Sequence, residues 1–305
     1  MSTEDVDVST QAGLSCPSCG APLQAGDRFC ERCGARLDDP QPEPGSAEEQ
    51  RIELDLTIAA AVSDQGLVHR RNEDSFHLEV AGERNVVVVV CDGISSASAG
   101  NIAARDAAGA AGAVLAQAIS DPDKDAGQAI VDAIQAAVDA VIQVEWTTRV
   151  KRVDPSCTLV CAVCRGADIT VGWVGDSRAY WFDREESHQL TVDDSFAEEG
   201  IAKGLLTPEQ AAKSPFLHSI TNWVGPDAPE RPPRTVSLRP ERPGRLLLCT
   251  DGLWNYAPSA SELGRLIDAL PDGAAPAAVG RALADTANER GGHDNITVAV
   301  VDIDP

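Results

Sequence analysis

The segment NVVVVVCDGIS, residues 85–95, joins an apolar run to an acidic turn. Its run of valines is too short for a typical helix and rich in β-branched side chains, so it predicts a buried strand. The strand ends at Asp92-Gly93. Other apolar runs of strand length follow the same plan and are separated by Gly-containing turns. We expect strands in residues 157–166, 168–177, 178–182, 234–238, 245–250 and 296–303.

Two Ala-rich segments, residues 99–119 and 126–145, have helical spacing and helical length. A helical hairpin is expected near residues 196–213, where Thr207 and Pro208 form a helix start and Gln210 completes a capping box. Strands, two adjacent helices, more strands and late helices do not alternate strictly. This order predicts an α+β layered domain.

Acidic residues stand at the ends of these apolar runs, far apart along the chain. A carboxylate fixed by a strand, with a glycine beside it, is a suitable ligand for a cation. Hard oxygen ligands favour magnesium or manganese over zinc, although each Asp-Gly pair alone would indicate only a turn. The clusters are Asn72-Glu73-Asp74, Asp92-Gly93, Gly175-Asp176, Asp251-Gly252 and Asp294-Asn295.

The text around these clusters resembles the ordered motifs of the metal-dependent (PPM, type 2C) serine/threonine protein phosphatases. The resemblance covers residues 55–303 and implies a β-sandwich flanked by helices on both faces. Each motif is weak alone, whereas all of them in family order are specific. They are SDQGLVHRRNEDSF (63–76), VVVCDGIS (88–95), SCTLVCAV (156–163), VGDSRAYWF (174–182), LTVDDS (190–195), LLLCTDGLW (246–254) and GGHDNITVAVV (291–301).

The same resemblance implies hydrolysis of phosphoserine and phosphothreonine by direct attack of a hydroxide held by two Mn²⁺ or Mg²⁺ ions. Asp92 would bridge the ions with the Gly93 carbonyl on one of them, and Asp251 and Asp294 would be the other direct ligands. Glu73 and Asp74 would hold metal-bound waters. Asn295 would orient water or a phosphate oxygen, and Asp176 would bind a weaker third ion.

The chain departs from the family pattern at several positions. His69 stands where the family has a phosphate-binding arginine; in an extended chain residues 69, 71 and 73 share a face, so Arg71 could replace it. Asn255 replaces an acid that helps to hold the third ion, which we therefore expect to bind weakly. Asp194 replaces a frequent histidine, with no consequence that the sequence reveals. Ile94, Ser95 and Ser96 follow Asp92-Gly93 without the histidine that some members carry.

A different metal is indicated by the cysteines of residues 16–37. Two CxxC pairs separated by ten residues, each followed by glycine, can place four thiolates around one structural zinc ion. The alternative is a redox or disulfide pair. Cys161 and Cys164 form another CxxC, but they are three positions apart in a strand and would face opposite sides of the sheet. The predicted zinc ligands are Cys16, Cys19, Cys30 and Cys33.

The composition also predicts how the chain is divided into segments. We expect a flexible leader at residues 1–15, a zinc ribbon at 16–37, an acidic Pro-rich linker at 38–51 and the phosphatase domain at 52–305. The net charge of −23, from 48 acidic and 25 basic residues, argues against nucleic acid as a partner. The acidic N-terminus and short apolar runs indicate a cytoplasmic protein without a membrane segment.

These observations favour an active phosphatase whose partners are phosphoproteins, the substrates of a Ser/Thr kinase. Three other functions stay open. The chain could be a pseudophosphatase or adaptor that acts through the zinc ribbon by binding a protein partner. It could also hydrolyse small phosphate esters, or bind nucleic acid through the ribbon. Retention of Asp92, Asp251 and Asp294 argues against a dead site.

Overall fold

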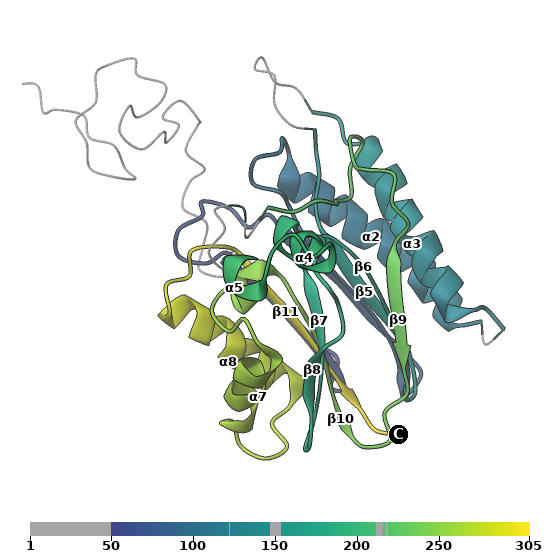
Figure 1. Ribbon diagram of the computed structural model, residues 1–305. Coiled ribbons are helices and arrows are strands. Elements are labelled where there is room, and N and C mark those ends of the chain that lie inside the picture. The colour runs from purple at the N-terminus through teal and green to yellow at the C-terminus, as the bar shows by residue number, and fades with distance from the viewer. Residues whose placement is uncertain (1–49, 122, 147–153, 212–215, 217–218) are drawn as a thin grey trace, which may run out of the picture. The chain divides into compact units, whose positions relative to one another are not determined.

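The computed structural model describes residues 50–121, 123–146, 154–211, 216 and 219–305. The predicted leader, the zinc ribbon and all but the end of the linker lie outside these ranges. Two antiparallel sheets form the centre of the domain (Figure 1). Among the helices of the described ranges, none combines the length and apolar character needed to cross a bilayer.

The first sheet has six strands in the order β1-β2-β11-β10-β7-β8. Neighbouring strands are antiparallel throughout this sheet. The strands are β1 (Arg51–Asp55), β2 (Ala59–Asp64), β11 (Ile296–Ile303), β10 (Gly244–Cys249), β7 (Arg178–Asp183) and β8 (Ser187–Gln189).

The second sheet has five strands in the order β3-β4-β5-β6-β9, also antiparallel. The valine run lies in β4, and its neighbours β3 and β5 pair along most of its length. The strands are β3 (Asp74–Ala81), β4 (Asn85–Asp92), β5 (Leu159–Arg165), β6 (Asp168–Val174) and β9 (Arg234–Leu238).

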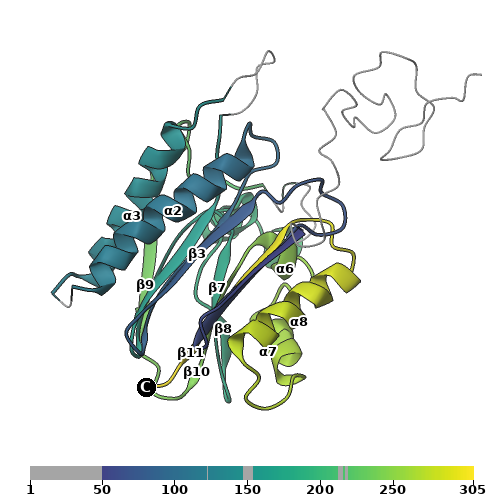
Figure 2. The ribbon, with the colours of Figure 1, turned by 180° about the vertical axis from the view of Figure 1, so that it is seen from behind.

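Helices cover the outer face of each sheet, so the domain has four layers (Figures 1 and 2). Helices α2 (Gly100–Ile119) and α3 (Ala126–Ile142) pack on the five-stranded sheet, and α6 (Asp251–Trp254), α7 (Ala260–Asp268) and α8 (Pro276–Glu289) pack on the other. The predicted sandwich flanked by helices on both faces is therefore confirmed.

The short helices α4 (Phe196–Ala202) and α5 (Pro208–Ala211) confirm the predicted hairpin. Thr207 and Gln210 form the reciprocal cap, because each side chain accepts a hydrogen bond from the other residue's backbone N–H.

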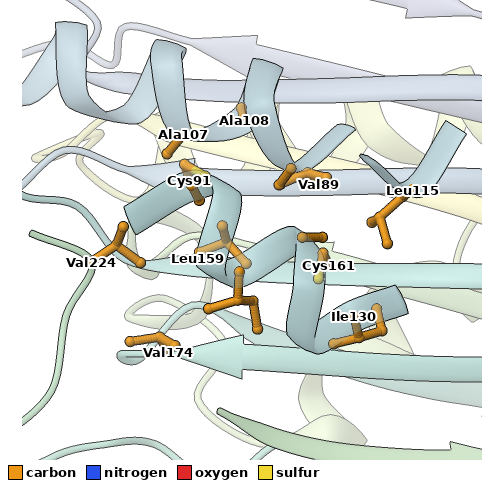
Figure 3. Close-up of a cluster of buried hydrophobic side chains, with 14 of the residues drawn as sticks. Val89, Cys91, Ala107, Ala108, Leu115, Ile130, Leu159, Cys161, Val174 and Val224 are labelled. Atoms are coloured by element: carbon orange, nitrogen blue, oxygen red, sulfur yellow. The ribbon is translucent and has the colours of Figure 1, made fainter. Parts of the chain in front are cut away.

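The period of two along a strand explains why β4 is apolar at every position from Val86 to Cys91. Val86, Val88 and Val90 face the core between the two sheets. Val87 and Val89 face the helices, and Figure 3 shows Val89 and Cys91 beside Ala107 and Ala108 of α2. Since both faces of the sheet are covered, no position of the strand can be polar without burying an unpaired group.

The CxxC of β5 follows the same rule. Cys161 belongs to the core under the helices and Cys164 to the core between the sheets, so the two thiols face opposite sides. Burial raises the pKa of both thiols to about 12. Both are free cysteines. The prediction that this pair is part of the core is confirmed.

Candidate active site

Five segments of the chain bring acidic residues together at one end of the sandwich. Asp92 ends β4 and is paired in register with Asp74, which begins β3. Asp251 is the first residue of α6, directly after β10. Asp176 lies in the turn between β6 and β7, and Asp294 lies just before β11. Strand ends that are distant in sequence thus meet, as the predicted cation site requires.

The electrostatics of this end are unfavourable for the protein alone. Burial, followed by repulsion from Asp74 and Asp251, raises the pKa of Asp92 well above its ordinary value. Burial and neighbouring carboxylates raise the pKa of Asp74 to about 7 and that of Asp251 to about 6. The pKa of Asp176 rises for the same two reasons, and Arg178 opposes the shift.

Two carboxylate oxygens in this cluster have no hydrogen-bond partner. Asp74 Oδ1 and Asp251 Oδ1 are buried and accept no hydrogen bond. The other Asp74 oxygen accepts a bond of 2.9 Å from the Thr250 hydroxyl. A buried carboxylate oxygen without a partner is costly, and a divalent cation would remove that cost. The donor set therefore fits Mg²⁺ or Mn²⁺.

Within the described ranges, no three His, Cys, Asp or Glu side chains converge closely enough to enclose a cation by themselves. Magnesium keeps several waters and is usually held by only one or two carboxylates. The residues that face this end of the sandwich fit that mode of binding.

The two glycines beside the acids are required by close backbone packing. A Cβ at Gly93 would lie 2.5 Å from the backbone of Gly100 and 2.7 Å from that of Glu73. A Cβ at Gly252 would lie 1.9 Å from the backbone oxygen of Asn295. Glycine thus lets the chain segments that carry the acids approach one another.

Asn295 is buried and holds the loop that precedes β3. Its Oδ1 accepts a hydrogen bond of 2.8 Å from the Glu73 backbone N–H. Its Nδ2 donates to the carbonyl oxygens of Gln65 at 2.7 Å and Arg71 at 3.0 Å. The sequence argument assigned Asn295 to water or phosphate, whereas these bonds give it a loop-anchoring role.

The two phosphate-binding candidates differ in their contacts. His69 Nε2 lies 3.3 Å from Asp294 Oδ1. Arg71 Nε lies 3.7 Å from Glu73 Oε1, and its side chain is 60% exposed. The chain bends at Arg70 and Arg71, so the argument from an extended segment does not hold. Burial raises the pKa of Glu73, and Arg71 and His69 oppose the shift.

Some residues of this end were not found from the sequence as site residues. Thr250 holds Asp74 through its hydroxyl. In contrast, Asn255 was already noted from the sequence as a departure at the third ion, and its Nδ2 lies 3.2 Å from Asp251 Oδ2. Trp254 donates from its indole nitrogen to the Asp176 carbonyl at 3.0 Å. Thr250 and Trp254 flank Asp251 within one motif, and that proximity was the available signal.

The sandwich with a buried acidic end defines a class of metal-dependent phosphatase domain. The family model "Protein phosphatase 2C" matches residues 68–295, and that of a "zinc-ribbon domain" matches residues 15–37. The chain belongs to the protein phosphatase 2C family, with a zinc-ribbon sequence before it.

Characterised relatives agree with this assignment. Serine/threonine protein phosphatase PstP of Mycobacterium tuberculosis is 31% identical over 256 residues, which are 83% of this chain. This chain spans only 46% of the length of that relative. Serine/threonine phosphatase stp of Listeria innocua is 26% identical over 248 residues, 79% of this chain and 93% of stp.

The fold of a solved relative matches as well. The catalytic domain of serine threonine protein phosphatase PstP, in complex with two manganese ions, superposes with a TM-score of 0.62 at 29% identity. The match covers 81% of this chain and 98% of that domain.

Proposed function

We propose that this protein is a serine/threonine protein phosphatase that depends on Mn²⁺ or Mg²⁺. One observation carries the proposal: Asp74 and Asp251 each bury an oxygen without a hydrogen-bond partner, beside other buried carboxylates. A pseudophosphatase would have no need to retain this costly arrangement. The names of the relatives support phosphorylated serine and threonine as the substrate class.

Two bound divalent ions would supply an activated water and neutralise the charge that develops on the phosphoryl group. Asp92, the Gly93 carbonyl, Asp251 and Asp294 are the groups proposed to hold them. Glu73 and Asp74 would position waters. Asn295 fixes the loop that carries Glu73, and Asp176 is the proposed ligand of a weaker third ion.

The test is phosphate release from phosphothreonine, phosphoserine and phosphotyrosine peptides and from a small phosphate ester. Turnover of the first two should require manganese or magnesium and cease in chelator. Asp168→Asn, at the far end of β6, is the matched control and should retain full activity. Full turnover by protein shown to be free of these metals would exclude the proposal. Turnover of the small ester alone would make the protein a small-molecule phosphatase.

Within this site we propose Arg71 as the phosphate anchor. Its guanidinium is mostly exposed, always charged and able to grip phosphate with two donors. His69 is already engaged by Asp294. Arg71→Ala should raise KM by on the order of tenfold while leaving kcat nearly unchanged, a loss of about 1.4 kcal/mol. If His69→Ala raises KM and Arg71→Ala does not, the histidine is the anchor.

For the N-terminal part we propose one structural zinc ion bound by four thiolates. The zinc-ribbon match and the paired CxxC motifs support this assignment and the division at residues 1–15, 16–37, 38–51 and 52–305. Purified protein should hold about one zinc, lost in Cys16→Ser. A chain that begins at residue 47 should hold none and still hydrolyse a phosphopeptide. If it folds but is inactive, the ribbon is part of the catalytic unit.

The biological setting is also a proposal. A Ser/Thr kinase would supply the phosphoproteins, and the ribbon would bind a protein partner. Cys91, Cys157, Cys161, Cys164 and Cys249 are free thiols, which suits the reducing cytoplasm. Comparing the phosphoproteome of cells with and without the active protein would identify the substrates.

A further inference from the structure

Two consecutive acids, Asp193 and Asp194, lie behind the turn that carries Asp176. Both are buried, with 6% and 2% of their surface exposed. The sequence shows that Asp194 departs from the family pattern but not what it does. The contacts of Asp194 in the structure indicate its role.

Asp194 holds Gly175 from both sides. Its Oδ2 accepts the Gly175 N–H at 3.1 Å, and its own backbone N–H donates to the Gly175 carbonyl at 2.9 Å. Gly175 has a φ of +100° and is close to Thr158, so another residue would be strained there. The carboxylate is fixed in turn by Asn222 at 3.1 Å and Arg234 at 2.5 Å.

The other side of the turn is fixed by Trp254, whose indole N–H donates to the Asp176 carbonyl. The Arg178 guanidinium stacks 3.7 Å from the centre of the Trp254 ring and forks onto the Asp193 carboxylate. The backbone on both sides of the Asp176 side chain therefore has little freedom.

We infer that Asp194 is a positioning residue, which through Gly175 holds Asp176 in place to bind the weaker Mn²⁺ or Mg²⁺ ion. This inference rests on the proposed function. A change at Asp194 should therefore alter the affinity for the weaker ion selectively, because Asp194 does not contact Asp92 or Asp294, the proposed ligands of the tighter ions. A residue that only stabilised the fold would affect all ions together.

The test is calorimetric titration of Mn²⁺ into the full chain after dialysis to remove manganese and magnesium. Wild-type protein should show a tight and a weaker class of binding. Asp194→Asn, nearly isosteric, should weaken the second class by about tenfold, as outer-shell changes do, and shift the first by less than twofold. Asp168→Asn, which removes another Asp–Arg pair at the far end of β6, should change neither.

A double-mutant cycle gives the decisive comparison. If Asp194 acts through Asp176, Asp194→Asn should cause no additional loss of the weaker class in an Asp176→Asn background. Should Asp194→Asn fail to fold, Asn222→Ala disturbs the same carboxylate more mildly and should shift the weaker class in the same direction.

The remaining outcomes separate this inference from the proposed function. A wild-type chain that binds no manganese overturns both. A chain with only the tight class, or with a weaker class that Asp194→Asn leaves unchanged or shifts together with the tight one, overturns the role of Asp194 alone.

Discussion

The two ends of the same β-sandwich differ in the partners of their acidic side chains. At the end where β4 and β10 finish, Asp92 and Asp251 are buried among other carboxylates. At the end where these strands begin, acids have arginine partners: Arg245 Nε lies 2.8 Å from Asp302 Oδ1, and Arg84 Nη2 lies 3.3 Å from Asp304 Oδ2. A cavity of about 530 Å³ at that end is lined by both pairs.

The difference lies in the partners of the acids. Pairing with arginine is available to the fold, since the same strands use it at their other end. At the acidic end Arg71 lies 3.7 Å from Glu73, but one oxygen of Asp74 and one of Asp251 are buried without a hydrogen-bond partner. Strained carboxylates of this kind are typical of functional sites. Four experiments test the difference between the two ends.

The largest effect is expected for Asp92→Asn compared with Asp302→Asn. The first should reduce phosphopeptide turnover by on the order of 10³-fold, about 4 kcal/mol of barrier, because no neighbour can replace the ligand. It should leave metal-free stability equal or higher, because one repelling charge is removed. Asp302→Asn should leave turnover unchanged and cost up to about 1 kcal/mol, since the pair is partly exposed. Thermal unfolding and steady-state kinetics measure both.

The second test is the pH dependence of stability without metal, in a chain that begins at residue 47 so that zinc plays no part. Burial and repulsion raise the pKa of Asp74 to about 7 and that of Asp251 to about 6, from 3.8 when unfolded. At pH values between the unfolded and the folded pKa, the folded state holds protons that the unfolded chain has released. Stability should therefore fall as pH rises from about 4 to about 7.

Manganese should reverse that trend, because it favours the ionised carboxylates. Melting temperatures at several pH values, with chelator and with manganese, measure the effect. In chelator, Asp74→Asn should flatten the profile more than Asp302→Asn, because burial raises the pKa of Asp302 as well but Arg245 opposes that shift. A profile that is flat for the wild-type protein would mean that the acidic end is not strained by its own charge.

The third test concerns Asn255, whose amide donates to Asp251. Asn255→Asp places a carboxylate, the better ligand for a hard cation, beside the weaker ion. The manganese concentration for half-maximal rate should fall by about threefold to tenfold, equivalent to about 0.7–1.4 kcal/mol. Asn85→Asp adds the same charge at the far end of β4 and should leave the titration unchanged. Equal curves for all three proteins would exclude a role for position 255.

The smallest effect is expected at Ala99, which precedes α2 at the acidic end with a φ of 54°. A left-handed conformation is unfavourable for alanine and not for glycine, so Ala99→Gly should stabilise the protein by roughly 0.5–1 kcal/mol. Gly109→Ala, at an open helical position, should stabilise through helix propensity instead. Urea unfolding measures both. Destabilisation by Ala99→Gly would show that the backbone there carries no strain.

Much of the domain could be predicted from local sequence. Strand and helix periods act over a few residues, so the valine run, the two long helices and the opposite-facing Cys161 and Cys164 were evident. Acids at strand ends were also visible in the motifs. The family match then agreed with the resemblance carried by those motifs.

Other features were decided only by tertiary structure. Asn295 anchors a loop whose Gln65 is 230 positions away, and Thr250 holds Asp74 across 176 positions. His69 pairs with Asp294 and Asp194 holds Gly175, contacts that no local period encodes. The physical reason is that strand order and register determine which distant side chains meet. The sequence pointed to the acids that the structure brings together at one end of the sandwich, and packing decided which neighbours contact them.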